Sequence, residues 1–181
     1  LHDHPLLRRL CLRGPALDLT GLEALLQSET SKLTELDIGR NYGSLFIGLP
    51  LVLRALAQRP TLTKLGLRCC RLGCDEARLL QMALCNLPSL QGLALTHDTL
   101  GSAGLAELAP ALSRNTSIKM LDISWNDLND MESAEILRDI LRSNETITTL
   151  DLTAIHFGQT TGAVECIVDG LVSNSTLQKM D

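Results

Sequence analysis

The sequence predicts an α/β solenoid, in which a short strand and a helix alternate along a stack of similar coils. Three observations predict this fold: a strand-like motif recurs along the chain, its copies start 26 to 30 residues apart, and an apolar helical stripe separates most neighbouring copies. A period of this length is typical of solenoids, whose units bury their apolar sides only against each other. We therefore expect one continuous domain over residues 1–181.

The clearest copy of the motif runs from Ile118 to Leu128 and reads L-x-x-L-x-L-x-x-N-x-L, with Ile in place of Leu twice. Its residues Leu121 and Ile123 alternate with polar neighbours, as in a half-buried strand. The copies start at Leu7, Leu33, Leu62, Leu90, Ile118, Ile147 and Leu177. In every copy the first, fourth and sixth positions that the chain reaches are aliphatic or Met.

The helices are predicted from the residues six, ten and thirteen places before a strand motif, which share one face of a helix. These stripes are Leu49, Val52, Leu56; Ala77, Leu80, Leu84; Leu105, Leu108, Leu112; Ala134, Leu137, Leu141; and Val164, Ile167, Leu171. We expect all of them to be buried behind the strands. The shorter first repeat leaves room for a helix over residues 21–28 only.

Two segments depart from the regular pattern. Pro110 lies within the fourth helix, where an interior proline removes a hydrogen bond, so we expect it to face outward and to cause a kink or a late helix start. The glycine-rich stretch over residues 39–44 delays the next inward Leu and predicts a small protruding loop.

The repeat resembles the leucine-rich repeat family, and within it the ribonuclease-inhibitor-like subtype, because a step near 28 residues accommodates a full helix. The match covers residues 7–181. The resemblance implies a right-handed β-α horseshoe with parallel strands on the concave face and helices on the convex face. Since the last motif is cut short at Asp181, we expect one module, or a fragment, of a longer protein.

The ninth motif position departs from the family pattern. The family prefers Asn or Cys there, to bond the backbone between repeats, and here the column is Pro15, Asn41, Cys70, Asp98, Asn126 and Ile155. Because Pro15 and Ile155 cannot form such side-chain bonds, we expect looser stacking at the first and sixth repeats.

Three N-glycosylation sequons begin at Asn115, Asn144 and Asn174. Each Asn lies three residues before a strand motif. We interpret this regularity as helix-ending residues in a left-handed conformation rather than as glycosylation sites.

Composition excludes several classes of function. A net charge of −5 argues against a nucleic-acid partner, and no apolar run approaches the ~20 residues of a membrane span. The six cysteines have no spacing typical of disulfides or zinc sites, which predicts reduced thiols and a cytoplasmic protein. Cys69 and His97 share a column, but two ligands without a third form a weak metal site. With no catalytic signature, we expect no enzyme, cofactor or small-molecule substrate.

The candidate site consists of strand positions between the inward leucines, whose side chains alternate toward the concave face. They are Arg9, Arg13, Glu35, Asp37, Arg40, Lys64, Arg68, His97, Met120, Asp122, Ser124, Trp125, Thr149 and Asp151. The basic residues of this set lie toward the N-terminal half, and Asp122 and Asp151 lie toward the C-terminal half, which favours a partner of matching polarity. Trp125, the sole tryptophan, is expected to be exposed, either as an interface anchor or packed against His97 or Ala154.

The favoured function is a protein–protein interaction module, the recognition part of a larger protein that is immune-receptor-like, inhibitor-like or effector-like. Two alternatives remain at this stage: a regulator of a small GTPase, similar to GTPase-activating proteins of this repeat class, and a structural spacer within a larger enzyme. The repeat fold alone does not choose among them.

Overall fold

The computed structural model describes residues 6–14, 20–28, 31–41 and 48–181. Within them, seven strands form one sheet in chain order, and every neighbouring pair is parallel. The strands are β1 (Arg9–Cys11), β2 (Glu35–Asp37), β3 (Lys64–Gly66), β4 (Gly92–Ala94), β5 (Met120–Asp122), β6 (Thr149–Asp151) and β7 (Lys179–Met180). Each strand begins two residues after a predicted motif start, which confirms the solenoid.

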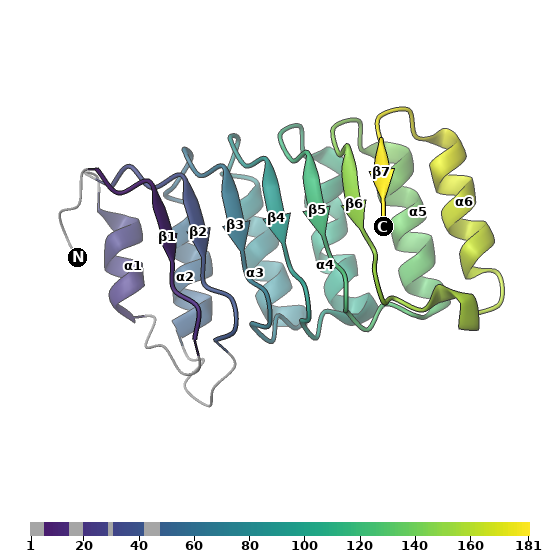
Figure 1. The fold of residues 1–181 in the computed structure, drawn as a ribbon, viewed down its shortest axis with the longest axis horizontal. Coiled ribbons are helices and arrows are strands. Elements are labelled where there is room, and N and C mark those ends of the chain that lie inside the picture. Colours follow the sequence, from purple (N-terminus) through teal and green to yellow (C-terminus); the bar gives the residue numbers. More distant parts are fainter. Residues whose placement is uncertain (1–5, 15–19, 29–30, 42–47) are drawn as a thin grey trace.

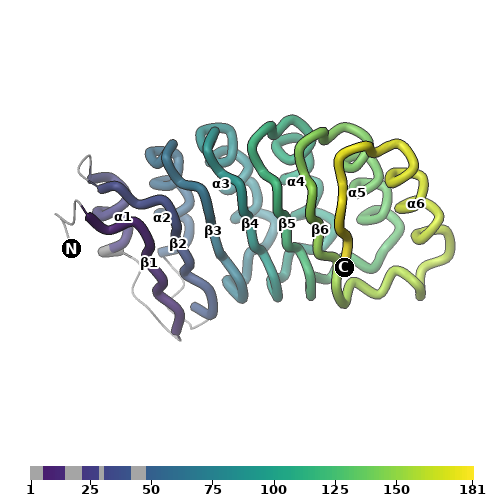
Figure 2. Tube along the Cα trace, turned by 45° about the horizontal axis from the view of Figure 1, so that its top comes forward, coloured from purple at the N-terminus to yellow at the C-terminus, as the bar shows by residue number. Residues whose placement is uncertain are grey.

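The helices form a second layer behind the sheet (Figure 1). They are α1 (Thr20–Gln27), α2 (Leu49–Leu56), α3 (Cys74–Leu84), α4 (Gly101–Arg114), α5 (Met131–Ser143) and α6 (Ala163–Ser173), and a 3-10 turn covers Phe157–Gln159. Successive helices lie side by side, so that each strand and helix make one coil of the stack (Figure 2). The predicted first helix is confirmed, one residue earlier than expected.

The core is a continuous row of aliphatic side chains between the two layers. The register sets Leu36 beside Leu65 and Leu93 beside Leu121, and each of these four is at most 2% exposed. The predicted helical stripes from α2 to α5 are buried against this row. At roughly 1.5–3 kcal/mol per buried side chain, such contacts between neighbouring repeats dominate stability.

The stripe prediction is wrong at Val164, which is 48% exposed. Ala163, the first residue of α6, takes the buried place instead, while Ile167 is buried and Leu171 is half-buried. In the described residues α6 packs against α5 and the 3-10 turn. Val164 projects away from these contacts, because no later helix of the described residues packs against α6.

The predicted late start of the fourth helix is also wrong. Helix α4 runs unbroken from Gly101 to Arg114 with Pro110 inside it. Pro110 is exposed, as expected, and Ala106, whose carbonyl loses its helical donor, is exposed as well. The carbonyl is therefore at an exposed residue, where solvent can take the place of the missing donor. Half of the glycine-rich stretch, residues 42–44, lies outside the described residues, and so does the predicted loop.

The ninth motif position forms a ladder of side-chain bonds between repeats. The Nδ2 groups of Asn41 and Asn126 donate to the carbonyls of Leu12 and Leu95 at 2.9 and 2.8 Å. The thiol of Cys70 makes the same contact with the Ile38 carbonyl at 3.5 Å. Pro15 lies outside the described residues, and the buried side chain of Ile155 adds to the core instead of bonding the backbone.

The interpretation of the sequon asparagines as left-handed is wrong. Asn115, Asn144 and Asn174 have φ values of −68°, −87° and −91° with extended ψ. Extended backbone lets the amide reach the preceding repeat: Asn144 Nδ2 donates to the carbonyls of Leu112 and Asn115. Asn174 repeats this contact one coil later. The regular spacing therefore reflects a second ladder, and at Asn144 and Asn174 it occupies the amide nitrogen that glycosylation would modify.

Arg59 takes the place of these asparagines before β3, three residues ahead of Leu62. It is only 6% exposed, and its guanidinium donates to the backbone carbonyls of Leu26, Ser28 and Ser31. One charged side chain thus joins the second repeat to the end of α1. The sequence could have indicated this role, because Arg59 lies at the same distance before its strand motif as the three asparagines do.

Candidate strand-face binding site

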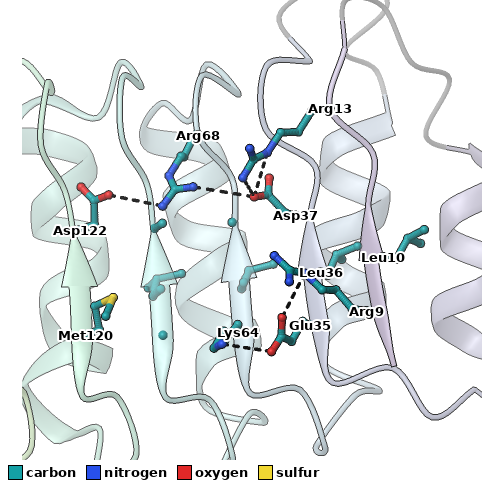
Figure 3. A pocket seen from close by; sticks show the side chains of 15 residues that line it. Arg9, Leu10, Arg13, Glu35, Leu36, Asp37, Lys64, Arg68, Met120 and Asp122 are labelled. Atoms are coloured by element: carbon teal, nitrogen blue, oxygen red, sulfur yellow. Dashed lines mark hydrogen bonds and ion pairs between the residues drawn. The ribbon is translucent and has the colours of Figure 1, made fainter. Parts of the chain in front are cut away.

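The strand face is the side of the sheet that carries motif positions three, five, seven and eight. Because side chains alternate along a strand, Leu36 points into the core while Glu35 and Asp37 project from the opposite side (Figure 3). The face is formed by short strands whose inward residues are fixed by packing. Its outward groups are therefore held in rows across the sheet.

The first row lies at motif position three. The carboxylate of Glu35 lies 3.3 Å from Arg9 and 3.1 Å from Lys64, so one acidic residue joins the basic residues of both neighbouring strands (Figure 3). These side chains are largely exposed, and each pair contributes at most about 1 kcal/mol.

The second row runs across the sheet from the end of β1 to β5. Asp37 accepts from Arg13 Nε at 3.0 Å, and Arg68 lies 3.8 Å from both Asp37 and Asp122 (Figure 3). Burial opposes ionisation of Asp37, but the hydrogen bonds from Arg13 and the Gly39 amide, with the charge of Arg68, outweigh it and lower its pKa. Asp37 is therefore ionised at neutral pH.

A hollow of about 210 Å³ lies between these rows and Met120 (Figure 3). Its floor is low because β3 and β4 carry Gly66, Gly92 and Ala94 on this side. A Cβ atom at Gly66 would lie 2.9 Å from the Asp37 carboxyl carbon, so only glycine lets that carboxylate lie across β3. The hollow has the size and the charged rim to receive a protruding side chain of another protein.

The eighth motif column has a backbone conformation that the sequence did not predict. Arg40, Cys69, His97, Trp125 and Ala154 all have φ between 55° and 63°. Left-handed backbone is unusual for residues with a Cβ, and the Gly or Asn that normally marks it is absent from these five positions. The same conformation in each coil makes the five side chains project in parallel.

Trp125 is exposed, as predicted, and it packs against His97, one of its two predicted neighbours. It is 53% exposed, and its ring stacks on His97 with centroids 4.7 Å apart and planes 14° from parallel. Such a stack fixes the ring orientation at a favourable energy of roughly 0.5–1.5 kcal/mol. Met120 is also exposed, at 56%, so two large apolar groups lie on this half of the face.

One predicted site residue is not exposed. Ser124 is 3% exposed, and its hydroxyl contacts Asp122 Oδ1 at 2.6 Å and Thr96 Oγ1 at 3.4 Å. A short polar side chain finds local acceptors where the strand turns, so it folds into the surface rather than projecting from it. Ser124 positions Asp122 instead of offering a contact of its own.

The cysteine and histidine columns do not converge on a metal site. Among the described residues, no group of three or more His, Cys, Asp or Glu side chains is arranged to hold an ion. Burial, followed by the nearby Asp98, raises the pKa of both Cys69 and Cys70, so these thiols stay protonated. Protonated thiols are poor metal ligands and poor nucleophiles.

In the part of the chain that the structure describes, no helix is long and apolar enough to cross a membrane. The strand-face groups remain the best-defined candidate site. The fold joins the charged residues from Arg9 to Asp122 in two rows and separately stacks Trp125 on His97.

The chain is similar to segments of several much larger proteins, although no protein-family model matches it. It is 31% identical to Protein NLRC5 of Mus musculus over 124 residues, which is 67% of this chain and 6% of that protein. It is 31% identical over 128 residues to NACHT, LRR and PYD domains-containing protein 13 of Homo sapiens, covering 70% of the chain and 12% of the relative. Tonsoku-like protein of Bos taurus is 36% identical over 110 residues, or 59% of the chain and 8% of the relative.

Among solved structures, an internalin from Listeria monocytogenes aligns with 91% of this chain and 50% of its own, at 17% identity and a TM-score of 0.43. The chain thus spans 12% or less of the length of the curated relatives named above. The recurring strand motif, the parallel ladder with one helix per coil and the similarity to a protein named for its leucine-rich repeats agree with one another. The chain is a leucine-rich repeat solenoid in its fold.

Proposed function

We propose that the chain is a protein-interaction module that binds a protein partner on its strand face. The observation that carries this proposal is the exposed Trp125, whose ring is held in place beside ordered charged rows. Rigid exposed aromatics are enriched among the residues that dominate binding energy at interfaces. The extended face of a solenoid is also the surface on which such proteins commonly hold partners.

The charge pattern supports a partner with matching polarity. The cations Arg9, Arg13, Arg40, Lys64 and Arg68 outnumber the carboxylates of Glu35 and Asp37 in the N-terminal half, whereas Asp122 and Asp151 lie in the other half. Complementary fields raise association rates and fix orientation more than they raise affinity. We assign the module to the ribonuclease-inhibitor-like subtype and to a cytoplasmic recognition protein, since its repeats carry helices and its cysteines have no disulfide spacing.

The test compares two exposed apolar side chains on opposite layers. Trp125→Ala is expected to weaken partner binding at least tenfold while lowering stability by only about 0.5–1.5 kcal/mol, the value of the lost stack. Met82→Ala, on α3, is the matched control, because Met82 is 59% exposed but lies on the helix layer. Binding is measured by pull-down with the chain as bait and then by calorimetry with the recovered partner, and unfolding by urea titration.

Asp122→Lys provides a second, electrostatic arm and is expected to slow association with the same partner. If Trp125→Ala binds the partner as well as Met82→Ala does, the interface does not lie on the strand face. The proposal would be overturned if Trp125→Ala and Asp122→Lys both bind the partner normally while a variant on the helix layer does not.

A further inference from the structure

The open face of Trp125 has a defined shape. One face of the ring is covered by His97, at the 4.7 Å spacing of the stack. The next place in the column belongs to Ala154, because the amide of Trp125 donates to the Thr153 carbonyl at 2.9 Å, just as the amide of His97 donates to that of Ser124. A methyl group therefore stands where a third planar group would continue the stack.

Ala154 keeps the same left-handed backbone, with φ of 63° beside 55° at Trp125. Its Cβ thus projects parallel to the Trp125 side chain but ends after one carbon. The slot above it is bounded by one aromatic face and is open to solvent, since Trp125 is 53% exposed. A planar group stacked on this open face would lie at about the spacing of neighbouring parallel strands, ~4.8 Å.

The charges around the slot select the kind of planar group. On the strand face of the fifth and sixth repeats, which the structure describes in full, the ionisable side chains are Asp122 and Asp151. Asp151 Oδ1 accepts from the Thr153 amide at 2.9 Å. The nearby Lys179 pairs with Asp181 and also interacts electrostatically with Asp151. Aromatic faces attract cations, and carboxylates at their edge add to the attraction.

We propose that this slot receives an arginine side chain of the protein partner. This inference rests on the proposed function and names the chemistry of that partner. The guanidinium is the planar side-chain cation that is always charged at neutral pH; it stacks on aromatic rings and donates in-plane hydrogen bonds to carboxylates. A lysine ammonium has the charge without the plane, and an aromatic side chain has the plane without the charge. The partner's arginine would extend the stack of His97 and Trp125 and face Asp151.

The test uses the single indole signal of the chain's only tryptophan in ¹⁵N-labelled protein. The probe is the blocked peptide acetyl-Gly-Arg-Gly-amide, and the comparison is the same peptide with citrulline, which keeps the planar shape but is neutral. The indole N–H and the amides of Thr153 and Ala154 are expected to shift with the arginine peptide. The shift at equal concentration should exceed that with citrulline about two- to fivefold, the ratio typical of an exposed cation–π contact.

Two variants separate the parts of the slot. Asp151→Asn keeps the oxygen that binds Thr153 but removes the charge, so the arginine shift should fall toward the citrulline value. Ala154→Met fills the slot and should remove the response to both peptides. Asp75→Asn on α3, also a single lost carboxylate but on the helix layer, should behave as wild type.

Equal shifts with arginine and citrulline, or an indole signal that neither peptide moves, would overturn this inference. The proposed function fails separately: it falls if Trp125→Ala binds the recovered partner normally, whatever the peptides do. If Trp125→Ala loses that partner while the arginine peptide leaves the indole unmoved, the interface stands and its arginine anchor does not.

Discussion

Replacing Asp98 by asparagine is expected to raise the stability of the chain at pH 7.5 by about 2–4 kcal/mol, an unusual direction for a core substitution. Asp98 occupies the ninth motif position, where Asn41 and Asn126 donate to carbonyls of the preceding repeat. Its Oδ1 accepts from the amides of Cys70 and Leu72 at 2.6 and 3.0 Å. Its Oδ2 is buried without a partner.

The chemical reason is that an ionised carboxylate cannot donate. At the Asn positions of the ladder, the amide nitrogen donates to backbone carbonyls. The corresponding carbonyls for Asp98 are those of Leu67 and Leu95, and by register Oδ2 faces them. An amide nitrogen there would donate to them, while the amide oxygen would keep both existing bonds. The Asp98→Asn substitution would thus convert the one acceptor-only member among the described residues of the ladder into a regular one.

The pH dependence gives the sign of the effect. Burial raises the pKa of Asp98 to about 7, against the opposing hydrogen bonds from backbone amides, whereas the ordinary value is 3.8. The folded chain therefore binds a proton that the unfolded chain has already lost. Stability from this group is fully present below about pH 4 and is lost as the pH rises toward 7. The difference corresponds to about 4 kcal/mol at most.

Urea unfolding of both proteins at several pH values measures this effect. The advantage of Asp98→Asn over wild type should be smallest near pH 4, grow up to about pH 7 and then remain constant. The control is Asp127→Asn, an exposed carboxylate of the next repeat, which should stay within about 0.5 kcal/mol of wild type. An advantage that does not change with pH would show that ionisation of Asp98 is not its source.

The sequence predicted the layers of this fold because burial leaves a periodic record. Leu36, Leu65 and Leu93 recur in phase, and each must be aliphatic to fill the same place in successive coils. The periodic pattern predicts the burial of Val164 wrongly. Its exposure depends on which helix packs against α6, and the sequence of one repeat does not specify its neighbour.

The candidate site was predicted less completely, since the alternation of a strand holds only while the chain remains extended. Glu35 and Asp37 project as expected, but Ser124 lies where the chain turns and is buried. The parallel stack of His97 and Trp125 arises from a left-handed backbone that neither residue type indicates. Which side chains pair also depends on rotamers, so the bridge from Arg68 to Asp122 across the glycine floor could not be read from spacing.

Replacing Arg59 by methionine is expected to lower stability by about 2–4 kcal/mol and to loosen the first repeat. The Arg59 guanidinium reaches the carbonyls of Leu26, Ser28 and Ser31, around the C-terminal end of α1. A cation at this end also favours the helix dipole. Methionine fills similar volume along the stem but donates nothing, so all three carbonyls lose the Arg59 donors and the Ser28 carbonyl keeps the Ser31 amide.

Three variants locate the cause. Arg59→Lys keeps the charge, but a single ammonium cannot span three carbonyls. The stability of this variant should therefore lie between those of wild type and Arg59→Met. Arg54→Met removes an exposed arginine from the preceding helix, α2, and should change stability by about 0.5 kcal/mol or less. Hydrogen exchange then tests the location: in Arg59→Met the amides of α1 should lose protection while those of α4 and α5 keep theirs, because repeats interact only with their neighbours. Protection lost evenly along the solenoid would instead mean that Arg59 supports the whole stack, and an unfolding midpoint equal to that of Arg54→Met would mean that its three bonds contribute no net stability.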